Sequence, residues 1–381
     1  MIRTIGILGG GQLGRMLTLE AKRMGFHVVT LEPLPNSPTG QVADEQIVAA
    51  YDDLRAIGEL GARSDVVTYE FENIPLDSVL ALEADRRIVH PGSTALRITQ
   101  ERILEKTFLR EAGIPVADFT PVRSRAELDA AENAIGYPGV LKTTLGGYDG
   151  KGQWVVRSRE DAERAWTEAK GRALIWERLI PFDRELSIIA ARNAQGQIVA
   201  FPVSENQHDH GVLATTIVPG RVEPAVAERA RRYATTVAER LEIIGTFCVE
   251  FFQRGDELLA NEIAPRVHNS GHYSLDATQI SQYELHVRAV CGLPLVEPRQ
   301  FAPAVMENIL GAGAGDTLGG VDDLLRERDL KLHLYGKAHA SLRRKMGHFT
   351  VLAPSIDEAL RKAEHGRARL HWVEDRAAAA R

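Results

Sequence analysis

The sequence predicts an α/β protein in which a parallel sheet near the N-terminus is followed by antiparallel sheets. The parallel sheet is indicated by a strand at residues 5–8, a glycine turn, a helix to about residue 24 and a strand at 28–31. The antiparallel part is indicated by strands joined through short polar turns, most clearly at residues 246–252 and 257–263. Because 381 residues exceed what one core usually supports, we expect two or three domains.

Composition and charge exclude several classes of protein. A net charge of −6 argues against general nucleic-acid binding, which needs a concentrated basic face. The two cysteines, Cys248 and Cys291, make neither a disulfide framework nor a metal cluster, which fits a reducing compartment. No membrane span and no signal-peptide pattern are apparent, so we expect a cytoplasmic protein.

The first glycine cluster has two interpretations. Gly9, Gly11 and Gly14 match the dinucleotide fingerprint, and Glu32 stands where a ribose-binding carboxylate would be expected. This pattern admits a nicotinamide or flavin site. The same glycines also permit a tight turn and close packing of helix on strand without any dinucleotide. The fingerprint alone does not decide between an oxidoreductase and a structural turn.

The first domain is predicted to span residues 1–99 with four or five parallel strands. One of them, at residues 65–69, ends in the acidic side chains Glu70 and Glu72. Ligands bind at such carboxyl ends in open α/β sheets, so one of these carboxylates is a candidate for a sugar hydroxyl. An amphipathic helix at residues 99–112 then connects to the next domain.

Residues 143–152 form the loop around which the second domain is organised. Four glycines occupy the last seven positions with Lys151 between two of them, so the loop amides can close around phosphate oxygens. Strands are predicted on either side, at 138–142 and 153–157, and capping boxes at Ser124 and Ser158 open the two neighbouring helices. This arrangement predicts a flap over a phosphate group.

Antiparallel strands follow at residues 174–179, 185–191 and 197–203, and a long helix at 224–241 precedes the hairpin. In the hairpin, we expect Glu250 and Glu262 to lie equally far from the turn, so that their carboxylates face each other across adjacent strands. Buried like charges are costly unless a cation separates them, and carboxylate oxygens suit magnesium. The hairpin therefore predicts a magnesium site, although ordinary strand carboxylates remain the alternative.

The segment after the hairpin, residues 264–273, gathers a guanidinium, two imidazoles and an amide, which indicates a catalytic loop. Zinc binding by its histidines is a weaker alternative, because no ligand spacing recurs. Strands at 330–335 and 347–352 predict a small C-terminal β-rich domain. The basic turn between these strands is either a solvated hairpin or a clamp for a phosphorylated substrate.

Four segments together resemble one family. They are residues 6–16, residues 146–153, Glu205-Asn-x-His208, and Asn261-Glu-x-Ala-Pro-Arg-x-His-Asn-Ser-Gly-His272. With the flap and the carboxylate hairpin, they resemble the N5-carboxyaminoimidazole ribonucleotide synthetases of the ATP-grasp superfamily, over about residues 3–352. The resemblance implies an α/β ATP-grasp fold: a Rossmann-like pre-ATP-grasp domain (1–99), an ATP-grasp domain (100–298, with a flap subdomain at about 115–180), a small C-terminal β-rich domain (299–373) and a disordered tail (374–381).

The resemblance also implies a set of site residues. The ATP-binding residues would be Arg97, Lys142, Gly147, Tyr148, Asp149, Gly150, Lys151, Gly152, Gln153, Glu177, Glu185, His208, Asn261 and Glu262. Magnesium would be held by Glu250 and Glu262, without a third ligand at Ala264, where many superfamily members have asparagine. The ribonucleotide would contact Glu72, Tyr148, Asp149, Lys151, Arg266, His268, Asn269, Lys337 and Arg344. Arg266, Lys151 and His268 are the residues predicted to be catalytic.

The implied reaction is ATP- and bicarbonate-dependent carboxylation of 5-aminoimidazole ribonucleotide through carboxyphosphate, in purine biosynthesis, by a homodimeric ligase. Other ATP-grasp ligases, namely formate-dependent glycinamide ribonucleotide transformylase and biotin carboxylase, are the nearest alternatives, and they would be expected to lack the segment from His268 to His272. A dinucleotide oxidoreductase would leave the flap, Glu250 and Glu262 unexplained. A non-catalytic nucleotide-binding module would not need so many polar groups beside the hairpin.

Overall fold

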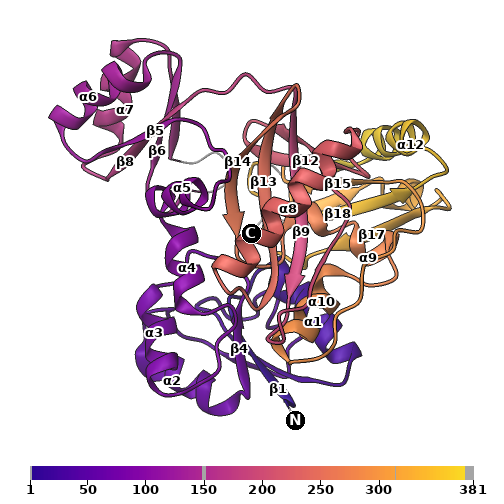
Figure 1. The fold of residues 1–381 in the computed structure, drawn as a ribbon. Helices are drawn as coiled ribbons and strands as arrows, with labels where there is room; N and C mark the ends of the chain where they lie inside the picture. Colours follow the sequence, from indigo (N-terminus) through magenta and orange to yellow (C-terminus); the bar gives the residue numbers. More distant parts are fainter. Residues whose placement is uncertain (1, 148–151, 314, 374–381) are drawn as a thin grey trace, which may run out of the picture.

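The computed structural model describes residues 2–147, 152–313 and 315–373. Its N-terminal sheet has the order β3-β2-β1-β4, and all of its pairs are parallel. The strands are β1 (Thr4–Leu8), β2 (His27–Leu31), β3 (Glu45–Ile47) and β4 (Val66–Tyr69). Helices α1 (Gln12–Arg23), α2 (Leu54–Arg63) and α3 (Leu76–Ala84) complete this unit, which lies at the bottom of Figure 1. The predicted parallel α/β unit is confirmed.

The predicted connector helix at residues 99–112 is wrong in one respect, because it is two helices. The first, α4 (Ser93–Gln100), and the second, α5 (Arg102–Glu111), are separated by Glu101, whose backbone is extended. The break has a tertiary cause. The amide of Arg102 donates to the carbonyl oxygen of Thr144 at 3.0 Å, a partner that helical periodicity cannot reveal.

The flap subdomain is a four-stranded antiparallel sheet with the order β5-β8-β6-β7, covered by two helices. It projects from the body at the upper left of Figure 1. Its elements are β5 (Phe119–Val122), α6 (Arg125–Ile135), β6 (Gly139–Thr143), β7 (Gln153–Val156), α7 (Arg159–Glu168) and β8 (Leu174–Arg178). Ser124 caps α6 by accepting from the amide of Glu127, and Ser158 caps α7 by accepting from the amide of Asp161, as the capping boxes predicted.

The second sheet has nine strands in the order β14-β13-β9-β11-β12-β15-β18-β17, with β10 paired to β9. The strands are β9 (Arg184–Arg192), β10 (Ile198–Ala200), β11 (Ser204–Asp209), β12 (Val212–Val218), β13 (Gly245–Arg254), β14 (Glu257–Ala264), β15 (Ala304–Leu310), β17 (Leu330–Leu334) and β18 (Lys345–Leu352). Apolar residues of α8 (Pro224–Arg240) share a core with β9, β13 and β14, and residues of α10 (Gln282–Val290) share another with β9 and β13.

Of the C-terminal strands, β15, β17 and β18 belong to the large sheet, whereas β16 (Thr317–Gly319) and β19 (His371–Val373) pair only with each other among the described strands. Val218 of β12 pairs with Ala304 of β15, so the large sheet runs without interruption into β15, β18 and β17. Helix α12 (Ile356–Arg369) covers this end, which lies at the right of Figure 1. Other short elements complete the region, namely η1 (Asn269–Gly271), α9 (Ser274–Ala277) and α11 (Val321–Leu324). The predicted tail at 374–381 lies outside the described residues.

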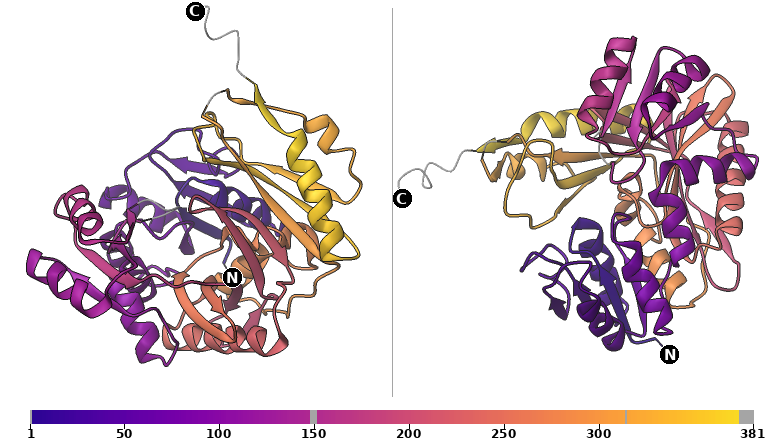
Figure 2. Two further views of the ribbon diagram at one scale, coloured as in Figure 1. Left: turned by 90° about the horizontal axis from the view of Figure 1, so that it is seen from above. Right: turned by 90° about the vertical axis from the view of Figure 1, so that its left-hand side faces the viewer.

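Figure 2 shows the flap subdomain, the N-terminal unit and the C-terminal strands arranged around the middle of the molecule. None of the helices in the described ranges has both the length and the apolar character that crossing a membrane requires.

Candidate active site

Two cavities of similar size meet inside this arrangement. One, of about 420 Å³, lies between the N-terminal unit and the segment after β14, and we call it the interdomain cavity. The other, of about 390 Å³, lies between the flap sheet and the large sheet, and we call it the flap cavity. Both are lined by Arg102, Glu262, His268, Asn269 and Lys345. A ligand in one cavity can therefore reach a ligand in the other across these five side chains.

The two hairpin carboxylates lie at this junction. Glu250 of β13 pairs directly with Glu262 of β14, so the predicted facing of the two carboxylates is confirmed. The predicted equal distance from the turn is wrong, because a register shift between Glu250 and Phe251 is what brings Glu262 opposite Glu250. Burial, followed by the nearby Glu262 carboxylate, raises the pKa of Glu250 above its ordinary value. Burial acts to raise the pKa of Glu262 as well, but Arg102 and Lys142 outweigh it and hold that pKa below its ordinary value. Glu262 is thus stabilised as an anion, whereas Glu250 is more readily protonated.

Unsatisfied polar atoms surround this pair. The side-chain oxygen of Asn261 and both amide atoms of Asn269 are buried without a hydrogen-bond partner among the described residues. Asn269 lines both cavities, and Asn261 lines the flap cavity. The site therefore offers hard oxygen atoms from the two carboxylates, which repel each other, and from an amide group that lacks a donor. Such a set suits a divalent cation of the magnesium type. The donor set present therefore fits magnesium.

The flap cavity has a charged end and an apolar end. At the charged end, the Lys142 ammonium lies 2.9 Å from a carboxylate oxygen of Glu177. The apolar end includes the stacked rings of Phe182 and Phe252, whose centroids are 4.8 Å apart, and the side chain of Leu213. Such a combination suits a ligand with a flat apolar group and a strongly anionic group.

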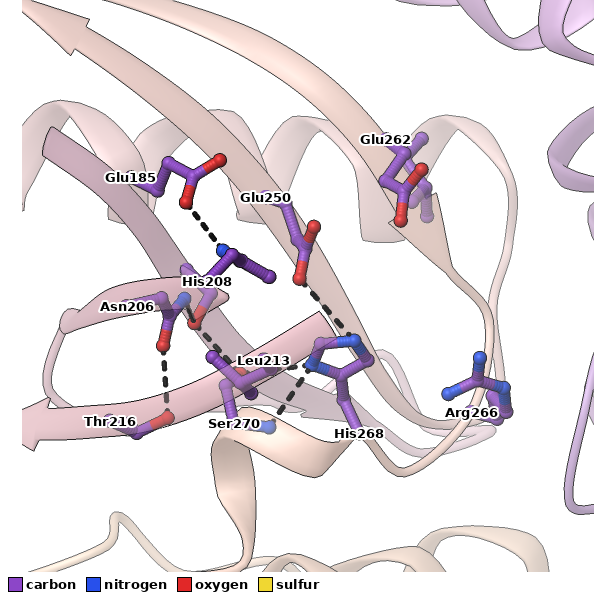
Figure 3. A network of polar contacts seen from close by, with 12 residues as sticks. Glu185, Asn206, His208, Leu213, Thr216, Glu250, Glu262, Arg266, His268 and Ser270 are labelled. Atoms are coloured by element: carbon purple, nitrogen blue, oxygen red, sulfur yellow. Dashed lines mark hydrogen bonds and ion pairs between the residues drawn. The ribbon is translucent and has the colours of Figure 1, made fainter. Parts of the chain in front are cut away.

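Glu185 and His208 form an ion pair on the wall of the flap cavity, on the neighbouring strands β9 and β11 (Figure 3). Burial acts to lower the pKa of His208, but the hydrogen bond to Glu185 and the charge of Glu250 outweigh it, so this pKa is raised. The pair offers carboxylate and imidazole groups to hydroxyl groups of a ligand.

The segment after β14 carries Arg266 and His268 into the junction. The Arg266 guanidinium pairs with the Glu72 carboxylate, which reaches in from the N-terminal unit. The His268 ring lies between Glu250, 3.4 Å from its Nε2, and Ser270, 2.9 Å from its Nδ1 (Figure 3). Burial, with Arg266 and Lys345 nearby, keeps the pKa of His268 well below its ordinary value, so the ring is neutral.

The structure gives little support for zinc binding by His268. Cys248, Glu250 and His268 lie close enough for their ligand atoms to share an ion. However, burial raises the pKa of the Cys248 thiol well above its ordinary value, and a protonated thiol is a poor zinc ligand. His272, the other histidine of the segment, instead bonds through Nδ1 to the Tyr283 hydroxyl at 2.8 Å.

Several predicted residues do not line either cavity. Arg97 is exposed on α4, on the far side of the helix break from Arg102, and its contact with ATP stays a prediction. Arg344 is exposed, and its guanidinium donates to the carbonyl of His339 at 3.0 Å. Lys337 is half-buried, and its ammonium donates to the carbonyl of Lys345 at 2.6 Å. The clamp formed by Lys337 and Arg344 therefore stays a prediction.

The glycine loop is only partly described, because Tyr148, Asp149, Gly150 and Lys151 lie outside the described residues. Gly147 lines the interdomain cavity, and Gln153 lines the flap cavity, so the two ends of the loop face different spaces. Gly152 has a φ of +70°, and a Cβ there would lie 2.7 Å from the hydroxyl oxygen of Thr143. Glycine is therefore required at this end of the loop on steric grounds.

The amides of the N-terminal glycine fingerprint bind a carboxylate of the protein itself. The Glu70 carboxylate accepts from the amide of Gly14 at 2.7 Å and also from the amide of Gly11. These amides are the donors that would hold a pyrophosphate in a dinucleotide site. Glu32, the expected ribose ligand, bonds instead to the Tyr51 hydroxyl. The loop is a structural turn, which removes the main feature that favoured an oxidoreductase.

Comparison with known proteins identifies the family. The family model of the ribonucleotide synthetase preATP-grasp domain matches residues 2–100, that of the ATP-grasp domain matches 107–283, and that of the phosphoribosylaminoimidazole carboxylase C-terminal domain matches 304–362. The N5-carboxyaminoimidazole ribonucleotide synthase of Brucella melitensis is 46% identical over 354 residues, 92% of this chain and 96% of the relative. The chain belongs to the N5-carboxyaminoimidazole ribonucleotide synthases.

Other members of this synthase family are also similar. The Bacillus subtilis synthase is 44% identical over 93% of this chain and 92% of its own. The crystal structure of the Aspergillus clavatus synthase in complex with ADP and 5-aminoimidazole ribonucleotide has a TM-score of 0.89 and 32% identity, covering 96% of this chain and 98% of that chain. The ATP-grasp fold and the ligase class predicted from the sequence are confirmed.

In this synthase, sequence reasoning missed two cations at the junction. Arg102 lies 3.2 Å from a carboxylate oxygen of Glu262, and Lys345 lines both cavities from the start of β18. Arg102 comes directly after the helix break at Glu101. The amphipathic pattern continues across this break, so it gave no sign that Arg102 begins a new helix. Lys345 belongs to the predicted basic turn, but only the pairing of β18 within the large sheet carries it to the hairpin carboxylates.

Proposed function

We propose that this synthase catalyses the ATP-dependent carboxylation of 5-aminoimidazole ribonucleotide to N5-carboxyaminoimidazole ribonucleotide, in purine biosynthesis. The observation that carries the proposal is the meeting of two cavities of similar size at the acidic pair Glu250 and Glu262. A reaction between two bound substrates needs this geometry, because holding both reactants in place replaces a bimolecular encounter.

ATP would occupy the flap cavity. The apolar end beside Phe182 and Phe252 would take adenine, and the pair of Glu185 and His208 would take the ribose hydroxyls. Lys142 would neutralise phosphate charge at the other end. The remaining contacts proposed for ATP are Arg97 and Gly152, together with Gly147, Gln153, Glu177, Asn261 and Glu262 of the cavity walls, and Arg102 is added to them.

Glu250 and Glu262 would hold magnesium. The ion, when bound, would offset the charge that develops on the transferred phosphoryl group and relieve the repulsion within the pair. The protein's own part is to keep both carboxylates in register on adjacent strands and to keep Glu262 ionised through Arg102.

The ribonucleotide and bicarbonate would share the interdomain cavity. Phosphoryl transfer from ATP to bicarbonate would give carboxyphosphate and ADP, and carboxyphosphate would release phosphate and carbon dioxide. The exocyclic amine of the ribonucleotide would then attack this carbon. Arg266, which pairs with Glu72, would orient the anion before carbon transfer. His268 is neutral there, so it would act through hydrogen bonds rather than charge.

The glycine loop would close over both substrates. Carboxyphosphate hydrolyses readily in water, so carbon transfer requires a site from which solvent is excluded. Tyr148, Asp149 and Lys151 would face the ribonucleotide, whereas the glycine amides and Gln153 would face ATP. Homodimer formation is a further part of the proposal and is tested by sedimentation equilibrium.

One measurement tests the reaction. Phosphate release from magnesium-ATP is followed with bicarbonate, with and without 5-aminoimidazole ribonucleotide, and the expected result is release that the ribonucleotide stimulates. Absence of stimulation would contradict the substrate assignment. Release that requires glycinamide ribonucleotide and formate would instead favour the transformylase reaction.

A further inference from the structure

A fully buried lysine stands behind the charged end of the flap cavity. Lys106 of α5 is 0% exposed and does not line either cavity. Its ammonium lies 3.3 Å from the carbonyl oxygen of Ala260 in β14 and 3.6 Å from a carboxylate oxygen of Glu177 in β8. The lysine therefore joins three parts of the chain: the connector helix, the large sheet and the flap sheet.

Glu177 thus has two ammonium partners with different surroundings. The same carboxylate oxygen is 2.9 Å from Lys142 and 3.6 Å from Lys106, and the Glu177 side chain is only 3% exposed. Lys142 lines the cavity, whereas Lys106 is shielded from it. The other oxygen of Glu177 has no hydrogen-bond partner among the described residues. A carboxylate this deeply buried needs a counter-ion at all times, because an unpaired buried charge is strongly unfavourable.

The two lysines have unequal freedom to move. Lys142 must point its ammonium at a phosphate group if it is to bind the nucleotide, and that movement removes it from Glu177. Lys106 has no access to the cavity and keeps its place. The charges around Glu177 agree with these different roles of the two lysines. Burial acts to raise the pKa of Glu177, but the charge of Lys106, followed by that of Lys142, holds this pKa at about 2.

We propose that Lys106 is a positioning residue that keeps Glu177 charge-balanced, so that the Lys142 ammonium is released to bind the phosphate groups of the nucleotide. Without Lys106, Lys142 is the remaining ammonium partner of Glu177 among the described residues, and Glu177 competes with phosphate for it. This inference rests on the proposed binding of ATP in the flap cavity.

The test compares a nucleotide with the nucleoside that lacks phosphate. Dissociation constants of magnesium-ADP and of adenosine are measured by calorimetry for the wild type and for Lys106→Met. Lys106→Met should weaken the binding of ADP about tenfold or more, equivalent to about 1.4 kcal/mol, and should leave the binding of adenosine nearly unchanged. In a Glu177→Gln background the same substitution should change ADP binding less than about threefold, because the competing charge is gone.

Controls separate this role from a structural one. Lys331→Met removes an exposed lysine of β17 that lines neither cavity, and it should leave both affinities unchanged. If Lys106→Met does not fold, Lys106→Gln, which can still donate to Ala260, should show the same loss of ADP affinity. Equal weakening of ADP and adenosine binding, or an equal loss of ADP affinity in the Glu177→Gln background, overturns the inference. A wild type that does not bind ADP overturns the proposed function and the inference together, whereas unchanged variants overturn the inference alone.

Discussion

Glu105 supplies a prediction that can be worked from the structure. This carboxyl group of α5 is buried beside Glu262, lines the interdomain cavity, and accepts from the amide of Ile263 at 2.6 Å. Burial, and then the Glu262 charge, raise the pKa of Glu105 to about 8. Because the folded state holds this proton and the unfolded state releases it near the ordinary pKa of 4.5, the folded state loses stability as pH rises between those values.

The magnitude follows from linkage. A group protonated only in the folded state gives a slope of about 1.4 kcal/mol per pH unit, so the folded state should lose roughly 2–3 kcal/mol between pH 5.5 and 7.5. Glu105→Gln keeps an oxygen for the amide of Ile263 and removes the titration, so the variant should lack this contribution. The difference should appear in magnesium-free buffer and should decrease when magnesium is added, since an ion at Glu262 opposes the raised pKa.

Urea unfolding of both proteins at intervals from pH 5.5 to 8.5 measures the effect. The free energy of unfolding of the wild type should fall relative to that of Glu105→Gln as pH rises. Parallel pH profiles for the two proteins would refute the reasoning, because they would mean that Glu105 is ionised in the folded state or that Glu262 does not act on it.

Further predictions concern the site. Arg102→Ala should lower kcat/KM by at least about tenfold, since it unpairs Glu262, and unchanged steady-state kinetics of this variant would contradict that role. Glu262→Gln should abolish phosphate release without altering the circular dichroism spectrum, and a fully active variant would refute the metal assignment. Lys151→Ala should raise KM for 5-aminoimidazole ribonucleotide more than KM for ATP, which initial-rate measurements with each substrate varied can check.

The sequence predicted those parts of the site whose geometry is local. That Glu250 and Glu262 share one hairpin follows from the tight turn between their strands, although their direct pairing also needs a register shift beside Glu250 that the spacing does not predict. The helix caps at Ser124 and Ser158 follow from spacing within one turn of helix. Arg102 could not be predicted in the same way. At the helix break, the amide of Arg102 donates to the carbonyl oxygen of Thr144, which lies 42 residues later in the chain. No local sequence pattern predicts this hydrogen bond.

The dinucleotide fingerprint near the N-terminus also could not be interpreted from local sequence alone. Gly11 and Gly14 are positioned as in a dinucleotide site, and their amides do bind an anion, but the anion is the carboxylate of Glu70, directly after β4, the strand that pairs with β1 in the sheet. The pattern predicted the local conformation correctly. What it could not predict was the occupant, because an intramolecular carboxylate satisfies the same amides as a phosphate group.

The uninterrupted large sheet explains why three parts of the chain are needed for one site. β14 carries Glu262, β18 begins with Lys345, and the N-terminal unit supplies Glu72 to fix Arg266. If the C-terminal strands formed an independent domain, Lys345 could move relative to Glu250 and Glu262. Because β18 is paired through β15 and β12 into the sheet that contains β13 and β14, the cation and the carboxylates are held on one framework. Closure of the flap would then bring the nucleotide to an already assembled set of charges, which is the arrangement that electrostatic stabilisation of phosphoryl transfer requires.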